Sequence, residues 1–181
     1  MSSVVSVTRA PLRPNAATPA LAAAVAAGGA VLLRLEPSAW TGVMAVAAAI
    51  LVWVAAIDLE SRLLPDRIVL PATLGVLIAS ALVQPTETIE HVLSALLAGG
   101  LLLIAALIRP GDLGFGDAKL MLLVGAMLGR SVGSALLLGF GLFALVGLVL
   151  LARDGRSALK RHLPLGPFIA IGTIAVLLLG G

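Results

Sequence analysis

The chain has 181 residues, of which 60% are hydrophobic and only 12% carry a charge, and its formal net charge is +3. Soluble domains are roughly 45–50% apolar and about 25% charged, and so few polar groups could not cover a soluble globule of this size. The composition therefore excludes a soluble enzyme, a coiled coil and a disordered tail. The small basic excess also argues against a nucleic-acid partner, because membrane proteins carry such an excess in their cytoplasmic loops.

Side chains that commonly bind metals are scarce. The chain contains no cysteine and two histidines, His91 and His162. Disulfides, thiolate nucleophiles and cysteine-ligated metals are thereby excluded, and two histidines so far apart in sequence do not suggest a histidine-rich metal cage. We therefore expect neither a metal nor a cofactor.

The N-terminal segment differs from the rest of the chain. Residues 1–18 are polar and include Arg9, Arg13 and Pro14, and we expect them to form a cytoplasmic arm. A signal peptide is the alternative, because basic residues precede an apolar run, but no convincing cleavage site follows. We expect residues 19–181 to form a single transmembrane domain.

Apolar stretches recur along that domain without a fixed repeat. They are Ala20–Leu35, Trp40–Ile57, Ile68–Val83, Val92–Ile108, Leu120–Leu128, Val132–Leu151 and Pro164–Leu179. A helix needs about 20 apolar residues to cross a bilayer, and continuous rather than alternating runs indicate helices rather than barrel strands. The sequence predicts an all-α polytopic membrane bundle of about seven transmembrane helices, with six as the alternative. The short Leu120–Leu128 run must tilt, borrow from its flanks or thin the bilayer.

The basic residues predict the orientation of this bundle. If the N-terminus is cytoplasmic, the outer side receives Arg34 and Arg130, and the cytoplasmic side receives the other ten of the twelve Lys and Arg residues, namely Arg9, Arg13, Arg62, Arg67, Arg109, Lys119, Arg153, Arg156, Lys160 and Arg161. Cytoplasmic loops are enriched in Lys and Arg. We therefore expect a multi-pass membrane protein, in contact with lipid and with its N-terminus on the cytoplasmic side.

Acidic residues number nine, and five of them fall in two clusters: Asp58, Glu60 and Asp66 in the first, and Asp112 and Asp117 in the second. The expected topology puts both clusters at cytoplasmic helix ends. Asp58 follows one apolar run and Asp117 precedes another, and an ionisable group at that depth is costly and is by default a functional candidate. The alternative is that both are ordinary interfacial loop acids.

Glycines surround the second cluster and recur after it. Gly114 and Gly116 permit a positive φ and the close approach of another backbone. Asp117, at the start of a helix, is expected to face the positive end of the helix dipole. Further along, Gly125, Gly129 and Gly133 are spaced four residues apart, which favours close helix packing.

Two further features flank the aspartates. Pro65 and Asp66 are expected to cap the helix that follows them, with Pro65 stiffening the turn. Lys119 is open to two interpretations: a cation that snorkels to the membrane boundary, or a partner that tunes Asp117.

A pair of aspartates brought together can share one proton, because two like charges in a low-dielectric site repel each other and the two carboxyl groups then lose their protons at different pH values. The charged carboxylate can deprotonate a water, and the protonated one can polarise a peptide carbonyl. This is the chemistry of aspartic proteases. Asp58 and Asp117 are too far apart in sequence for one helix, so they meet only if their helices pack side by side.

The two clusters resemble, in order, the signatures of bacterial type IV prepilin peptidases. The first is Asp58, six residues, then Pro65-Asp66, and the second is Gly114-Phe-Gly116-Asp117-Ala-Lys119. A third element, Pro164-Leu-Gly166-Pro167, is similar to a proline-rich turn in the same family. The Gly-x-Gly-Asp element is shared more distantly with other intramembrane aspartic proteases.

The resemblance implies an aspartic endopeptidase that removes the basic leader of prepilins or pseudopilins at the cytoplasmic membrane face, cutting just before the substrate's hydrophobic helix. It implies Asp58 and Asp117 as the catalytic pair, with supporting or substrate-binding residues Pro65, Asp66, Gly114, Gly116 and Lys119. Because the chain lacks the paired cysteines of a methylating domain, it resembles a short, peptidase-only form. The oligomeric state does not follow from the sequence.

Two other classes of protein compete with this interpretation. A small transporter or proton relay would also carry membrane carboxylates, but near the bilayer midplane rather than at helix ends. A non-catalytic subunit of a pilus or secretion assembly would tolerate replacement of both aspartates.

Overall fold

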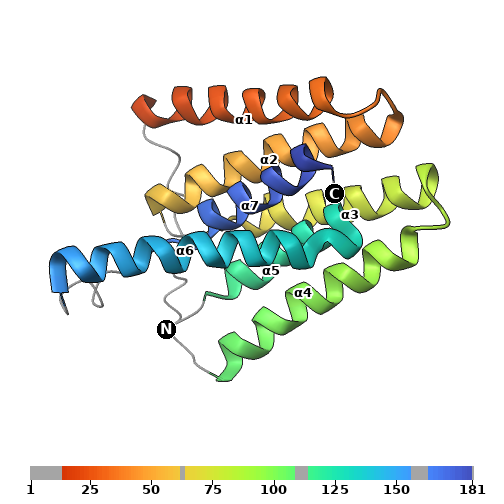
Figure 1. Cartoon of the computed structure of the whole chain (residues 1–181). Coiled ribbons are helices and arrows are strands. Elements are labelled where there is room, and N and C mark those ends of the chain that lie inside the picture. Colours follow the sequence, from red (N-terminus) through yellow and green to blue (C-terminus); the bar gives the residue numbers. More distant parts are fainter. Residues whose placement is uncertain (1–13, 62–63, 109–113, 156–162, 181) are drawn as a thin grey trace, which may run out of the picture.

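The computed structural model describes residues 14–61, 64–108, 114–155 and 163–180, and within these ranges it contains helices and no β-strand. In chain order the elements are α1 (Pro14–Arg34), α2 (Ala39–Ser61), α3 (Asp66–Val83), α4 (Thr88–Ile108), α5 (Phe115–Leu128), η1 (Gly129–Ser131), α6 (Val132–Asp154) and α7 (Gly166–Leu179). Successive helices run in opposite directions through one bundle (Figure 1). The predicted all-α bundle is confirmed, and each apolar run corresponds to one helix.

Five segments of the described chain are long and apolar enough to cross a membrane: 17–34, 39–61, 66–83, 88–108 and 115–154. The last of these contains α5 and α6, and the chain reverses direction between them at η1 (Figure 1). The 14 residues of α5 rise only about 21 Å, against a hydrocarbon core of about 30 Å. The protein is a multi-pass helical membrane protein whose short helices are α5 and α7.

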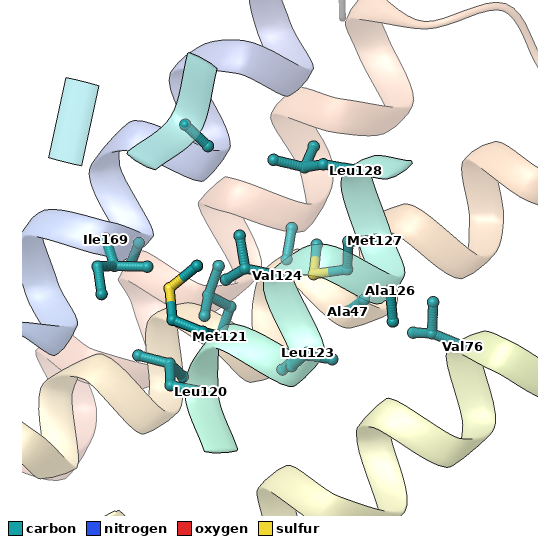
Figure 2. Close-up of a cluster of buried hydrophobic side chains, with 14 of the residues drawn as sticks. Ala47, Val76, Leu120, Met121, Leu123, Val124, Ala126, Met127, Leu128 and Ile169 are labelled. Carbon is teal, nitrogen blue, oxygen red and sulfur yellow. The ribbon is translucent and has the colours of Figure 1, made fainter. Parts of the chain in front are cut away.

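Helix α5 lies at the centre of the bundle (Figure 2). Its fully buried side chains include Leu120, Met121, Leu123 and Val124, and they pack in one cluster with Ala47 of α2, Val76 of α3 and Ile169 of α7. A helix that is apolar on all sides is compatible with the bundle interior as well as with lipid, and the contacts of α5 place it in the interior. Helix α5, whose first turn carries Asp117, is therefore held among four other helices, because α4 packs against it as well.

Glycines let two pairs of helices approach closely. A Cβ added to Gly125 would lie 2.5 Å from the Ser94 carbonyl oxygen of α4, and one added to Gly172 would lie 2.5 Å from the Ala135 oxygen of α6. The packing role predicted for the glycine series holds for Gly125. It was wrong for Gly133, where an added Cβ meets nothing within 4 Å. Gly129 has left the helix and adopts φ 53° in η1.

The first helix begins earlier than the apolar run that predicts it. α1 starts at Pro14, so residues 14–18 are helical rather than part of an arm. Proline is favoured in the first helical turn because a backbone N–H at that position makes no intrahelical hydrogen bond, so its absence in proline costs none. The rest of the expected arm, residues 1–13, lies outside the described residues, as do Asp112 and Arg62.

Candidate active site

Asp58 lies in the last turn of α2, which continues past its apolar run to Ser61. Its residue is only 6% exposed, and it is the one fully buried acid in the described ranges of the chain. The backbone N–H of Gly166 donates a 3.1 Å hydrogen bond to Asp58 Oδ2. Because Gly166 begins α7, this contact brings a helix N-terminus, with its partial positive charge, to a carboxyl group that burial would otherwise make costly.

Gly166 is the site residue to which the sequence analysis gave no role. A Cβ at this position would lie 2.8 Å from Asp58 Oδ2, so only glycine lets α7 approach the carboxyl group without displacing it. The available signal was the Pro164-Leu-Gly166-Pro167 element. That element is now seen to end at a backbone donor to one of the two candidate aspartates.

Asp117 is the third residue of α5, as its predicted place at a helix start requires. Its Oδ2 accepts a 3.3 Å hydrogen bond from the backbone N–H of Gly114, one residue before the helix. Such a contact satisfies one of the unpaired donors at a helix start. Asp117 is half-buried, and its carboxyl group is close enough to that of Asp58 for the two to interact electrostatically.

The two aspartates line one small cavity of about 230 Å³ at the shared end of α2, α3 and α5. Its other lining residues are Leu64, Asp66, Gly114, Phe115 and Gly116. Both predicted catalytic residues and three of the five predicted supporting residues are thus brought together. Pro65 and Lys119 are outside the lining.

Neither glycine of this cavity has an unusual backbone, and of the two it is Gly116 that makes a close approach, since a Cβ added to Gly114 would meet no atom closer than 3.5 Å. Gly114 has φ −78° and Gly116 lies within α5, so neither uses the positive φ that glycine permits. A Cβ on Gly116 would lie 2.9 Å from Leu64 Cβ. Gly116 therefore lets the chain before α3 pack directly against the first turn of α5.

Asp66 and Lys119 form an ion pair between α3 and α5, with Lys119 Nζ 2.6 Å from Asp66 Oδ2. Lys119 does not take Asp117 as its partner, because helix positions two apart point in different directions. The expected cap is built differently from the prediction: Pro65 is the N-cap, Asp66 is the first helical residue, and no side chain caps the helix. Both charged groups are partly exposed, so the pair contributes about 1 kcal/mol or less.

A larger cavity of about 760 Å³ opens at the opposite end of the bundle. Its charged residues are ion-paired or exposed to solvent: Glu90 Oε2 lies 2.6 Å from Arg130 Nε, and Glu36 and Glu87 are exposed. His91 is buried there, and its Nδ1 lies 2.8 Å from the Ala126 carbonyl oxygen. The small cavity is the better candidate because it combines a buried acid with a second, interacting one.

Two interacting carboxyl groups, one buried and one half-buried, can hold one proton between them. One group can then act as a base toward water while the other donates a hydrogen bond to a carbonyl oxygen. The site therefore has the components of acid–base hydrolysis at a helix-bundle end.

Comparison with known proteins identifies the family of this chain. Residues 45–153 match the model of the type IV leader peptidase family. The matched range contains both aspartates and the whole lining of the small cavity. The chain belongs to the type IV leader peptidase family.

Individual members of this family are similar over most of the chain. The prepilin leader peptidase/N-methyltransferase of Aeromonas hydrophila is 35% identical over 82% of this chain and 53% of its own length. Those of Bacillus subtilis and Burkholderia pseudomallei are each 34% identical, over 72% and 88% of this chain and 53% of their own lengths. The chain thus spans about half the length of these relatives. No solved structure matches it.

Proposed function

We propose that the protein is a membrane-embedded aspartic endopeptidase that removes the basic leader from type IV prepilins or pseudopilins. The observation that carries the proposal is the shared cavity of Asp58 and Asp117. These two acids come from helices far apart in sequence and interact at one end of the bundle. The names of the relatives supply the substrate class, since each is called a prepilin leader peptidase.

In the proposed reaction, the charged carboxylate takes a proton from a water molecule, and the water oxygen adds to the carbonyl carbon of the peptide bond. The protonated carboxyl group hydrogen-bonds the carbonyl oxygen and stabilises the charge that develops there. Collapse of the tetrahedral intermediate breaks the C–N bond and passes a proton to the departing amine. The products are a carboxylic acid and an amine, and the pair again holds one proton.

The cytoplasmic face is the proposed side of this reaction. Among the described residues, Arg67, Lys119 and Arg153 lie toward the helix ends that carry the aspartates, whereas Arg34 and Arg130 lie toward the opposite ends. The positive-inside rule assigns the more basic end to the cytoplasm. A basic leader would then meet a cavity that contains three carboxyl groups, those of Asp58, Asp66 and Asp117.

Cleavage by the purified protein tests this function. We expect the full chain, reconstituted in liposomes with a prepilin-like polypeptide, to release the leader by one cut just before the substrate's apolar helix. Mass spectrometry of both fragments locates the cut. Recovery of only intact substrate in the presence of folded protein would contradict the proposal.

A further inference from the structure

A second hollow of the molecule lies on the membrane-spanning flank of α2 and α3. It is a groove of about 670 Å³ whose lining is apolar throughout: Ala39, Gly42, Val43, Val46, Ala47 and Ile50 of α2, and Ile68, Pro71, Ala72, Gly75, Val76 and Ala79 of α3. On each helix these residues recur every three or four positions, so they form one continuous stripe. The groove therefore follows α2 from Ala39 to Ile50 and α3 from Ile68 to Ala79.

The groove is hollow because of two glycines that the fold itself does not require. A Cβ on Gly42 or Gly75 meets no atom within 4 Å, unlike one on Gly125 or Gly166. A glycine inside a helix is less favourable than alanine by roughly 0.5–1 kcal/mol. Open glycines also occur elsewhere in the bundle, for example Gly141 in α6, but Gly42 and Gly75 both line this groove, one from each helix.

The groove leads toward the candidate active site. It ends at Ile50 of α2, and eight residues further along the same helix lies Asp58. At 1.5 Å per residue this offset is about 12 Å, which three or four extended residues span. On α3 the groove ends at Ile68, close after Asp66, which lines the catalytic cavity. A chain cut beside Asp58 can thus enter the groove within one short extended segment.

We propose that this groove binds the transmembrane helix of the substrate, directly after the bond that is cut. The inference rests on the proposed function, in which the cut precedes an apolar helix anchored in the same bilayer. Small residues at a helix interface let two membrane helices approach closely, and Gly42, Ala47, Ala72 and Gly75 provide such a surface. The groove positions the substrate's helix, and the aspartates act on the extended segment that precedes this helix in the substrate sequence.

Filling the groove should separate substrate binding from chemistry. Gly42→Leu and Gly75→Leu place a large side chain in the hollow, and leucine is a better helix former than glycine. For a prepilin-like substrate with its transmembrane helix, we expect kcat/KM to fall about tenfold or more. For a short peptide that carries the leader and cleavage site but no helix, we expect no change. Gly141→Leu, at an equally open glycine of α6, is the matched control and should cleave both substrates normally.

Unchanged cleavage of the anchored substrate by both groove variants would overturn the proposal, and so would an equal loss with both substrates. Cross-linking gives a readout that needs no cleavage. Because the chain has no cysteine, a Gly75→Cys variant has a single thiol, which we expect to cross-link to a cysteine on the substrate's helix, whereas Gly141→Cys should not. If the wild-type protein cleaves neither substrate, the proposed function fails. The cross-link then still decides whether the groove binds the helix, and the absence of a cross-link at Gly75→Cys would refute that binding.

Discussion

Asp58→Asn and Asp117→Asn should each abolish leader cleavage in a protein that keeps its fold. An amide neither accepts a proton from water nor donates one to the departing amine at neutral pH, so either change removes one half of the acid–base pair. Positioned acid–base groups contribute about 10²–10⁴ in rate, and we expect losses of at least that size. The asparagine oxygen can still accept the hydrogen bond from Gly166, so the contact between α2 and α7 survives the change at Asp58.

The measurement is the initial rate of leader release in liposomes, with helix content and melting temperature in detergent as tests of the fold. Glu60→Gln is the matched control, because Glu60 is an exposed acid two residues from Asp58 that does not line the cavity. We expect the control to cleave at the wild-type rate. If either aspartate variant kept more than about a tenth of that rate, the assignment of this pair would fail.

Gly166→Ala should slow cleavage by about tenfold to a hundredfold, although alanine adds only one methyl group. The new Cβ would lie 2.8 Å from Asp58 Oδ2 and 3.3 Å from its Cγ. The carboxyl group must therefore move, and misplacement of a catalytic group by about 1 Å can cost 10²-fold in rate. Since the aspartates themselves are retained, activity falls without being lost.

Gly133→Ala is the control for this substitution, because an added Cβ there meets nothing within 4 Å. The two variants should differ in kcat with the short leader peptide, whose binding does not involve the groove. A Gly166→Ala protein with the kcat of the control would show that the contact between α7 and Asp58 does not position the carboxyl group.

The fold could be predicted from the sequence because each membrane helix is a continuous apolar run. What the runs could not give was the place of polar residues at helix ends. The run before Asp58 stops at Ile57, but α2 continues to Ser61, so Asp58 is a helical residue and is buried. The central position of α5 was also beyond prediction, because its apolar sequence resembles that of lipid-facing helices.

The aspartates of the site could be predicted because acids are rare in this chain and chemically distinctive. The contact between Gly166 and Asp58 could not be predicted. The residue type does not reveal which backbone N–H makes a hydrogen bond, and no spacing rule relates positions so far apart in sequence. The partner of Lys119 was left open between a snorkelling role and Asp117, and the structure pairs it with Asp66 across two helices. Local sequence proximity was a poor guide there because helical side chains two positions apart diverge.

The rival classes of function make different predictions about the same residues. A transporter or proton relay needs carboxyl groups along a path through the bilayer, whereas Asp58 and Asp117 lie in the last turn of α2 and the first turn of α5. A non-catalytic assembly subunit would keep its function in both asparagine variants. Leader release by the wild-type protein and its loss in those variants would exclude both classes.

The convergence of the two aspartates is most directly tested by cross-linking them. Because the chain has no cysteine, an Asp58→Cys/Asp117→Cys double variant carries the two thiols alone. A short thiol-specific cross-linker should join them in the folded protein, and thereby fix α2 to α5. The Asp58→Cys/Arg130→Cys variant should stay unlinked, because Arg130 follows the far end of α5. An unlinked Asp58→Cys/Asp117→Cys protein that is folded and has both thiols reactive would contradict a shared catalytic cavity.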